Sequence, residues 1–227
     1  MKKGKYIIDL YKSIDGKSFN VDEAVKFFID KKRNKFDETI EVSMNLGIDP
    51  RHADQMVRGV VSLPNGNGKS MKVAVFAKEK KAEEAKLAGA DVVGAEELAE
   101  DMNKGNLNYD RVIATPDMMG VVGRIGKILG PKGLMPNPKF GTVSLDIKKS
   151  VQDLKKGKVE IRCDKDGNLS LSIGRVNFDD RKIVENFKSV LDVVEKDKPS
   201  GSKGNFINSI HITSTMGPSA KIALTGV

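Results

Sequence analysis

The sequence is poor in the residues on which disulfides and metal sites depend. It contains one cysteine, Cys163, two histidines, His52 and His211, and no tryptophan. A single cysteine excludes an internal disulfide, which fits a reducing cytoplasm. One thiol and two histidines far apart in the chain do not form the closely spaced ligand set of a zinc site, so we expect no bound metal. Cys163 alternates with Arg162 and is expected to be a small core residue rather than a nucleophile.

Long hydrophobic runs are also absent. No apolar stretch approaches the roughly 18 residues that a membrane-spanning helix needs, so we expect no membrane partner. The stretch MKKGKYIIDLYKS is basic but has no long apolar region, so we expect no secretory signal there. These absences together predict a cytoplasmic protein.

Positive charge is in excess. The 227 residues include 39 Lys and Arg against 31 Asp and Glu, which gives a formal net charge of +8. Hydrophobic residues make up 39% and charged residues 31% of the chain, as in a folded globular protein rather than a disordered one. The excess of cations favours an acidic partner, such as nucleic acid or an anionic membrane face. It also fits the ordinary charge that keeps a protein in solution.

Hydrophobic periodicity predicts half-buried strands near both ends of the sequence. Apolar and polar residues alternate in residues 36–46, 159–163, 169–173 and 209–215, and a further strand is expected at residues 57–63. Helices with an apolar stripe are expected at residues 6–14 and 21–28, the second with Asn20 and Glu23 as a capping box. Another is expected after Asp179 or Asp180. A hairpin turn is expected at residues 164–167.

Between residues 68 and 158 the pattern changes. Residues 71–77 form a nearly continuous apolar strand, which is typical of a sheet covered on both faces. Further strands are expected at residues 91–93 and 111–114, and helices at residues 78–88, 96–102, 117–125 and 147–154. Alternating strands and helices predict a small parallel α/β unit with right-handed crossovers.

We therefore predict an α/β fold with two domains. An α+β terminal domain is made of residues 1–67 and 159–227, and a parallel, Rossmann-like α/β domain of residues 68–158 is inserted into it. Two connecting strands at the junction would form a hinge.

A basic stretch rich in glycine and proline runs from Arg124 to Val143. It contains no acidic residue, and its cations are Arg124, Lys127, Lys132 and Lys139. Glycine and proline keep much of it out of regular helix or strand. Cations on such a loop favour binding of a polyanion, because glycine lets the backbone approach the polyanion closely and lysine supplies positive charge. The same composition also fits an ordinary basic surface loop with turn residues.

Small polar side chains line the outward face of the predicted terminal strands. They are Thr39, Ser43, Asn45, Ser170, Ser172, Ser209, Thr213 and Thr215. A flat, hydroxyl-rich surface can contact sugars in the shallow minor groove of RNA, although serine and threonine are common on the wet face of any antiparallel sheet. Lys35 and Lys165 add positive charge. Phe36 adds an aromatic ring that either stacks on a base or packs.

Patterns typical of nucleotide-binding enzymes fail on inspection. Gly68-Lys69-Ser70 ends like a phosphate-binding loop, but Leu63 stands where the leading glycine is needed and a strand follows in place of a helix. The first strand of the middle segment is followed by Lys78-Glu79-Lys80 instead of a glycine fingerprint. We therefore predict that the chain is not an enzyme and uses no cofactor. The rival hypotheses are a nucleotide-using enzyme built on the middle domain and general DNA binding through charge.

Several longer motifs carry a family resemblance. They are GKILGPKGLMPNPKFGTV at residues 126–143, FDETIEVSMNLGIDPR at 36–51, VRGVVSLP at 57–64, AGAD at 88–91, ATPDMMG at 114–120 and TSTMGPS at 213–219. Together they resemble the L-one family of large-subunit ribosomal stalk proteins, of the bacterial type. The resemblance spans nearly the whole chain.

The resemblance implies a function in the large ribosomal subunit. Family members bind the base of a mobile stalk of ribosomal RNA, as a monomer within the ribosome, and the stalk moves with deacylated tRNA at the exit site. Many bacterial members also bind and repress their own messenger RNA. The mechanism implied here is shape readout, in which hydroxyls and backbone amides of residues 215–217 meet sugar and base edges.

The resemblance also implies which residues bind RNA. The main set is Lys35, Phe36, Thr39, Lys165, Ser209, Thr213, Thr215, Met216 and Gly217. The four cations of the basic stretch, Arg124, Lys127, Lys132 and Lys139, are expected to form a secondary RNA contact.

Overall fold

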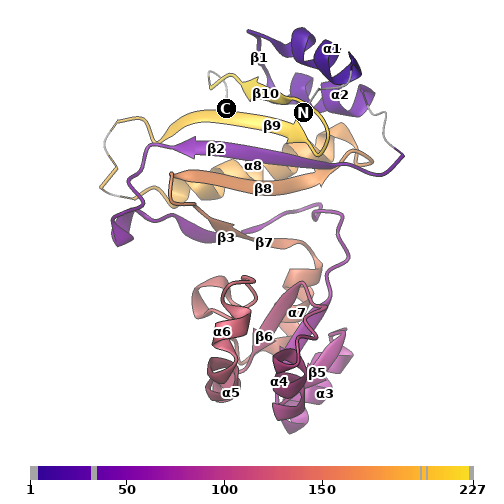
Figure 1. Cartoon of the computed structure of the whole chain (residues 1–227), viewed down its shortest axis with the longest axis vertical. Coiled ribbons are helices and arrows are strands. Elements are labelled where there is room, and N and C mark those ends of the chain that lie inside the picture. Colours follow the sequence, from indigo (N-terminus) through magenta and orange to yellow (C-terminus); the bar gives the residue numbers. More distant parts are fainter. Residues whose placement is uncertain (1–4, 32–34, 200, 203, 225–227) are drawn as a thin grey trace. The chain divides into compact units, whose positions relative to one another are not determined.

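The computed structural model describes residues 5–31, 35–199, 201–202 and 204–224 (Figure 1). The chain forms two compact units. The first, here called the terminal unit, contains residues 1–68 and 159–227, and the second, the middle unit, contains residues 69–158. Both mix helices and strands, so the predicted α/β class is confirmed. Within the described residues, every helix is too short or too polar to cross a membrane.

A five-stranded sheet organises the terminal unit. Its strand order is β1 (Ser18–Phe19), β10 (Ser219–Ile222), β9 (Ile207–Ser214), β2 (Thr39–Leu46) and β8 (Asn168–Arg175). β1 runs parallel to β10, and the other neighbours are antiparallel. The predicted alternation of β2, β8 and β9 is confirmed. β1 and β10 were not predicted, because two and four residues are too few for a period to show.

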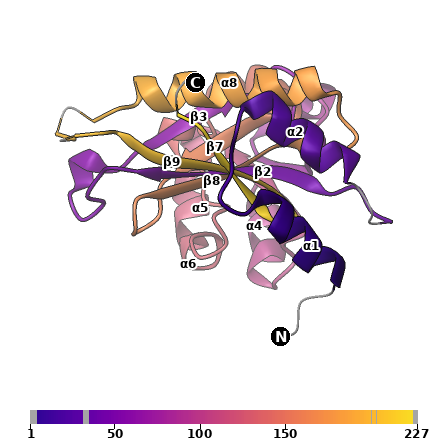
Figure 2. The same cartoon turned by 90° about the horizontal axis from the view of Figure 1, so that it is seen from above.

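Helices α2 (Val21–Asp30) and α8 (Asp180–Lys196) lie on the same face of this sheet (Figure 2). The first helix, α1 (Lys5–Ile14), buries Leu10 and Ile14. The capping box predicted for α2 is present, since the backbone N–H of Asn20 donates to the Glu23 carboxylate at 3.2 Å. Satisfying this donor helps to set where the helix begins.

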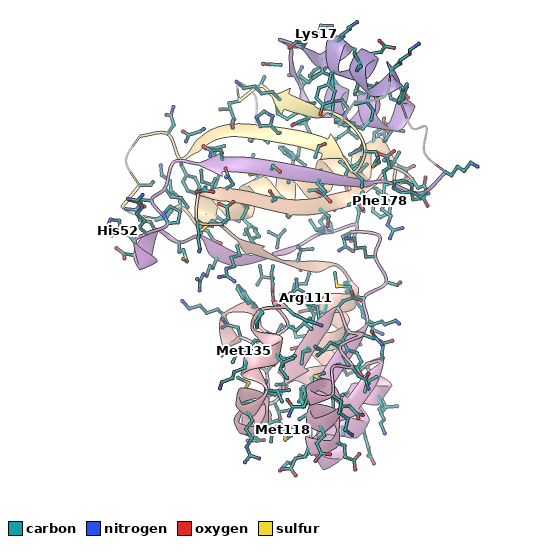
Figure 3. All side chains as sticks on the ribbon, viewed as in Figure 1. Lys17, His52, Arg111, Met118, Met135 and Phe178 are labelled. Atoms are coloured by element: carbon teal, nitrogen blue, oxygen red, sulfur yellow. The ribbon has the colours of Figure 1, made fainter. Side chains whose placement is uncertain are left out.

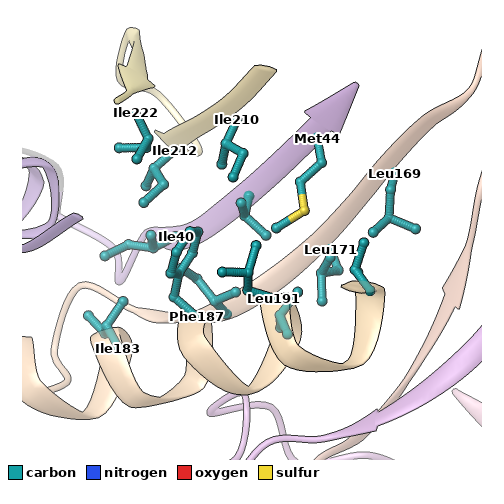
Figure 4. Close-up of a cluster of buried hydrophobic side chains, with 14 of the residues drawn as sticks. Ile40, Met44, Leu169, Leu171, Ile183, Phe187, Leu191, Ile210, Ile212 and Ile222 are labelled. Carbon is teal, nitrogen blue, oxygen red and sulfur yellow. The ribbon is translucent and has the colours of Figure 1, made fainter. Parts of the chain in front are cut away.

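The core of the terminal unit lies between α8 and the sheet (Figure 4). Phe187 of α8 and Ile40, Met44 and Ile210 of the sheet are at most 1% exposed. Burying each such side chain contributes about 1.5–3 kcal/mol. The predicted apolar stripe of α8 is therefore confirmed.

The stripe is interrupted by the buried Asn186, whose amide donates to the carbonyl oxygens of Gly66 and Ile173.

A second, two-stranded sheet pairs β3 (Arg58–Ser62) with β7 (Lys158–Arg162). A short 3₁₀ helix, η1 (Ala53–Gln55), precedes β3. The turn at residues 164–167 is present, but the expected hairpin is wrong. The strands on either side of it belong to different sheets, because β7 pairs with β3 and β8 pairs with β2. Cys163 directly follows β7 and is buried, as predicted.

The middle unit contains a three-stranded parallel sheet in the order β5 (Val92–Gly94), β4 (Val73–Phe76) and β6 (Arg111–Ala114). All four residues of β4 are buried. Val73 and Val75 pack in one apolar cluster, and Ala74 and Phe76 pack in another. Successive side chains point to opposite faces of a strand, so this sheet is covered on both sides, as predicted.

Helices and turns of the middle unit follow the predicted alternation with strands. The regular helices are α3 (Glu79–Leu87), α4 (Glu96–Asn103), α5 (Met119–Arg124), α6 (Gly126–Leu129) and α7 (Ile147–Lys155). Two 3₁₀ helices, η2 (Pro116–Met118) and η3 (Pro138–Phe140), accompany them. The one-turn helix α6 lies inside the basic stretch, where the sequence indicated mostly irregular structure.

Candidate nucleic-acid interface

The sheet of the terminal unit presents a polar face opposite to its apolar core. In β2, Glu41 is exposed and Ser43 and Asn45 are half-buried, whereas the residues between them are buried. The strand pairings place polar residues in rows across β8, β2 and β9. The rows are Asn168, Asn45 and Ser209; Ser170, Ser43 and His211; and Ser172, Glu41 and Thr213. The predicted outward position of these side chains is confirmed.

Side chains of these rows hydrogen-bond to one another and to the adjacent Asn208. The hydroxyls of Ser43 and Ser170 are 3.0 Å apart. The Asn45 amide donates to Asn168 Oδ1 at 2.8 Å, and the Asn208 amide donates to Asn45 Oδ1 at 3.0 Å. Such side-chain bonds hold the polar groups in one arrangement.

One end of the polar face is closed by the loop that follows β9. The backbone N–H of Thr39 donates to Thr215 Oγ1 at 3.0 Å, and the backbone N–H of Thr215 donates to the Thr39 carbonyl at 3.1 Å. Thr215 and Met216 are exposed, and Phe36 just before β2 is 50% exposed. The structure therefore brings Thr39, Thr215 and Met216 together, and Phe36 stands three residues before Thr39 in the chain.

The buried carboxylate of Glu38 supports the same loop. The backbone N–H of Met216 donates to Glu38 Oε2 at 3.3 Å, and Glu38 is 6% exposed. Sequence reasoning missed this residue, because an acid just before a strand usually faces solvent. Its burial follows from a contact between residues far apart in the chain, and periodicity carries no signal of that kind.

The backbone amides of this loop are all engaged within the protein. The N–H groups of Thr215, Met216 and Gly217 donate to Thr39, Glu38 and Ser214 respectively. The expectation that these amides contact RNA therefore needs correction. The Thr215 hydroxyl is also bonded to Thr39, so the exposed groups of this loop are the Met216 side chain and the outer surface of Thr215.

Gly217 has a packing reason to be glycine. A Cβ atom at this position would lie 2.4 Å from Ser214 Oγ and 3.3 Å from a ring carbon of Phe28. The first distance is well inside van der Waals contact, so any larger residue must displace the Ser214 hydroxyl and push the Phe28 ring by a few tenths of an ångström. The neighbouring Thr213 also stabilises this turn, because its hydroxyl lies 3.1 Å from the Pro218 carbonyl.

Two of the predicted RNA-binding residues lie at the other end of the sheet. Ser209 is paired with Asn45, which is separated from Thr39 by about 20 Å of extended strand. Lys165 is exposed in the turn before β8, and Asn168 at the start of β8 is also paired with Asn45. The predicted set therefore divides into a cluster around Thr215 and a smaller group around Ser209.

The turn that carries Lys165 is fixed by Asp164. Its carboxylate accepts hydrogen bonds from the backbone N–H groups of Asp166 at 2.9 Å and Asn168 at 2.8 Å. These bonds, that from Asn168 foremost, hold the pKa of Asp164 below its usual value. The carboxylate therefore stays charged and keeps the exposed lysine on an ordered turn.

His211 lies in the middle row of the polar face. Partial burial lowers the pKa of His211, and the nearby Lys221 lowers it further. Its Nδ1 atom is 3.3 Å from the Ser219 hydroxyl. A neutral imidazole at neutral pH can accept as well as donate a hydrogen bond.

The basic stretch of the middle unit contains α6 and η3 and presents its cations at the surface. Arg124, Lys127, Lys132 and Lys139 are all exposed. The Asn137 carboxamide oxygen accepts from the Lys139 N–H at 3.0 Å, and the Asn137 N–H donates to the Thr142 hydroxyl at 2.8 Å. Met135, labelled in Figure 3, is 45% exposed among these cations.

Features of an enzyme or metal site are not evident in the described residues. Within residues 5–31, 35–199, 201–202 and 204–224, no group of three His, Cys, Asp or Glu side chains could hold a metal ion. His52, labelled in Figure 3, precedes η1.

Comparison with protein families shows that the model described as the ribosomal protein L1p/L10e family matches residues 26–218. The match includes β2, β8, β9 and the whole middle unit.

Proposed function

The chain belongs to the ribosomal protein L1p/L10e family, and we propose that it binds the stalk region of large-subunit ribosomal RNA through its terminal unit. Membership makes it a structural protein of the large ribosomal subunit that binds ribosomal RNA, and not an enzyme. Its place is the ribosome, and so the cytoplasm.

The observation that carries the proposal is the cluster at one end of the polar sheet face. Thr215 and Met216 are exposed there on a loop that three hydrogen bonds hold against Thr39. Phe36 offers an exposed ring three residues before Thr39, and the polar rows continue from Thr39 across the sheet. An A-form RNA presents a wide minor groove with 2′-hydroxyls, so a flat surface of hydroxyls and amides can read its shape.

We propose that residues 1–67 and 159–227 form the RNA-binding domain, residues 68–158 a Rossmann-like domain, and two connecting strands a hinge. Contacts of the first connector support this boundary. The Asn65 N–H donates to Asn186 Oδ1 at 3.1 Å, and the Asn65 amide donates to the Glu185 carboxylate at 2.8 Å. These bonds fix the chain to α8 as far as Gly66, so the freedom of a hinge would begin beyond that point.

The main RNA-binding residues in this proposal are Lys35, Phe36, Thr39, Thr213, Thr215, Met216 and Gly217, with Ser209 and Lys165 at the far end of the sheet. Phe36 and Met216 contact RNA directly, whereas Gly217 and Thr213 shape the loop. The exposed cations Arg124, Lys127, Lys132 and Lys139 provide a secondary contact through phosphate attraction.

We further propose that the protein assists the movement and release of exit-site tRNA as the stalk moves. A structure in its own messenger RNA that resembles the stalk would meet the same surface, so the protein would also repress its own translation. The family resemblance supports both proposed roles, and we propose that the protein acts as a monomer within the ribosome.

Competition binding tests the main proposal. Purified protein is titrated into labelled stalk RNA, with unlabelled bulk DNA duplex or unlabelled stalk RNA as competitor. We expect stalk RNA to compete at a far lower concentration, because binding through charge alone shows little preference among nucleic acids. Equal competition by both would overturn the proposal in favour of general charge-driven binding. Sequencing of RNA that co-purifies with the protein provides an independent check.

A further inference from the structure

The terminal unit contains a pocket of about 360 Å³ beside the candidate interface. One wall comes from Tyr6 and Ile7 of α1, another from Phe27 of α2, and Lys31, Lys35 and Met216 complete the lining with the loop after β9. The volume falls at the lower end of the range of small-ligand pockets, about 300–1,000 Å³. The pocket therefore has room for one small, flat ligand.

Contacts between its walls hold the pocket open in one shape. The Tyr6 hydroxyl donates to the Lys31 carbonyl at 2.7 Å, which ties α1 to the end of α2. The rings of Phe27 and Phe28 meet edge to face with their centroids 5.5 Å apart. Phe28 is 4% exposed, so it supports Phe27 from beneath.

The pocket combines an aromatic lining with charges of both signs. Lys31 and Lys35 are exposed, whereas the Glu38 carboxylate is buried on the side of the Met216 loop. Cations at exposed positions favour a phosphate outside the pocket. The inner carboxylate disfavours a bare anion deep inside and favours a flat ring whose edge carries N–H donors.

We propose that this pocket receives one unpaired nucleobase that swings out of the bound RNA. The base would lie against the aromatic lining, and its phosphate would lie near Lys31 and Lys35. Aromatic side chains combined with basic residues are the usual platform for single-stranded bases. The inference rests on the proposed function, because Lys35 and Met216 belong both to the pocket and to the candidate RNA surface. An RNA on that surface therefore passes the opening of the pocket.

A pair of tryptophan variants on α1 tests the proposal. Ile7→Trp places a large ring in the pocket, whereas Ile8→Trp makes the same change at a neighbouring residue that is 40% exposed and does not line the pocket. We expect Ile7→Trp to weaken binding of stalk RNA about fivefold or more, the loss expected when one stacked base is displaced. Ile8→Trp is expected to bind like the unchanged protein. Thermal unfolding of both variants checks that they fold alike.

Ultraviolet cross-linking gives a second readout. RNA cross-linked to the unchanged protein should leave nucleotide adducts on the peptides that carry Tyr6 or Phe27, and Ile7→Trp should abolish them. Equal affinity of both variants, with no adduct on these peptides, would overturn the pocket proposal and leave the proposed function standing. Failure of the unchanged protein to bind stalk RNA would instead overturn the proposed function and, with it, this inference.

Free nucleotide provides the remaining comparison. Adenosine monophosphate offers the same ring and phosphate without the rest of the RNA. If it binds the unchanged protein while Ile7→Trp still binds stalk RNA normally, the pocket is a site for free nucleotides and the proposed RNA-borne base is wrong. We expect no such binding at millimolar concentration, because a single base lacks the contacts that the sheet surface adds.

Discussion

Glu38 and Met216 are joined by a hydrogen bond between a buried carboxylate and an exposed loop. The Met216 N–H donates to Glu38 Oε2 at 3.3 Å, and the two residues are 178 positions apart in the chain. One is 6% exposed and the other 52% exposed. The buried partner thus positions a side chain that is presented to solvent.

The first prediction concerns this pair. Removing an acid near an RNA surface should strengthen binding if charge alone matters. We expect the opposite for Glu38→Ala, about a tenfold loss of affinity for stalk RNA, because the loop loses its support. Glu38→Gln keeps an acceptor oxygen and should retain most of the affinity. Tighter binding by Glu38→Ala in a gel-shift titration would show that the carboxylate has no positioning role.

The second prediction compares the loop with single lysines. Thr215→Ala removes the hydroxyl that accepts from the Thr39 N–H, and Met216→Asp places an anion on the surface. Either change should cost far more affinity than Lys127→Ala or Lys139→Ala, because one exposed phosphate contact is weak. Thr215→Ser keeps the hydroxyl and serves as the matched control. Losses of the same size at the loop and at the lysines would contradict shape readout by the loop.

The third prediction concerns salt. If about six phosphates are neutralised by lysine and arginine, affinity should fall by roughly a thousandfold between 50 and 200 mM monovalent salt. Filter binding across this range gives the slope directly. Replacing Lys35 with Met should make the salt dependence shallower by the amount expected for one lost phosphate contact. Thr215→Ala should lower the affinity without changing the salt dependence. A slope near zero would show that phosphate contacts contribute little.

The fourth prediction concerns glycine. Gly217→Ala should destabilise the protein by about 1–3 kcal/mol, because its methyl group would overlap the Ser214 hydroxyl and press on Phe28. Gly123→Ala in α5 meets no atom within 4 Å and should stabilise its helix by about 0.5–1 kcal/mol. Chemical denaturation measures both. If Gly217→Ala leaves the free energy of unfolding unchanged, the loop can shift at little cost.

The fifth prediction concerns pH. Burial, followed by Lys221, lowers the pKa of His211 in the folded protein relative to the value near 6.5 of a free histidine. The unfolded chain therefore takes up this proton first as pH falls. Neutral His211 therefore makes its full contribution to the free energy of unfolding above the unfolded pKa. This contribution is lost as pH falls from about 6.5 towards the folded pKa.

A variant separates this effect from other titrations. His211→Asn removes the titrating group, so the fall in unfolding free energy between about pH 7.5 and pH 5.5 should be smaller in the variant than in the unchanged protein. Denaturant unfolding at both pH values measures it. An equal fall in both proteins would assign the pH dependence to other groups.

The sequence by itself determined the fold class, the strand types and most of the core. Alternation in residues 40–46 and the apolar stripe of α8 predicted which side chains are buried, because burial on one face imposes a period of two on a strand and near 3.6 on a helix. The continuous apolar run around β4 predicted the covered parallel sheet for the same reason. The same alternation of apolar and polar residues predicted the exposed polar face, including Ser43 and Ser170.

Only the tertiary structure decided how the candidate interface is assembled. Thr39 and Thr215 are 176 positions apart, and nothing periodic in either segment predicts that they hydrogen-bond. The burial of Glu38, the separation of Ser209 from Thr39 along β2, and the pairing of the short strands β1 and β10 are also long-range results. Periodicity reports which side of an element faces the core. Which elements become neighbours depends on the packing of the whole unit, and that packing places the Thr215 loop beside Thr39 and Glu38.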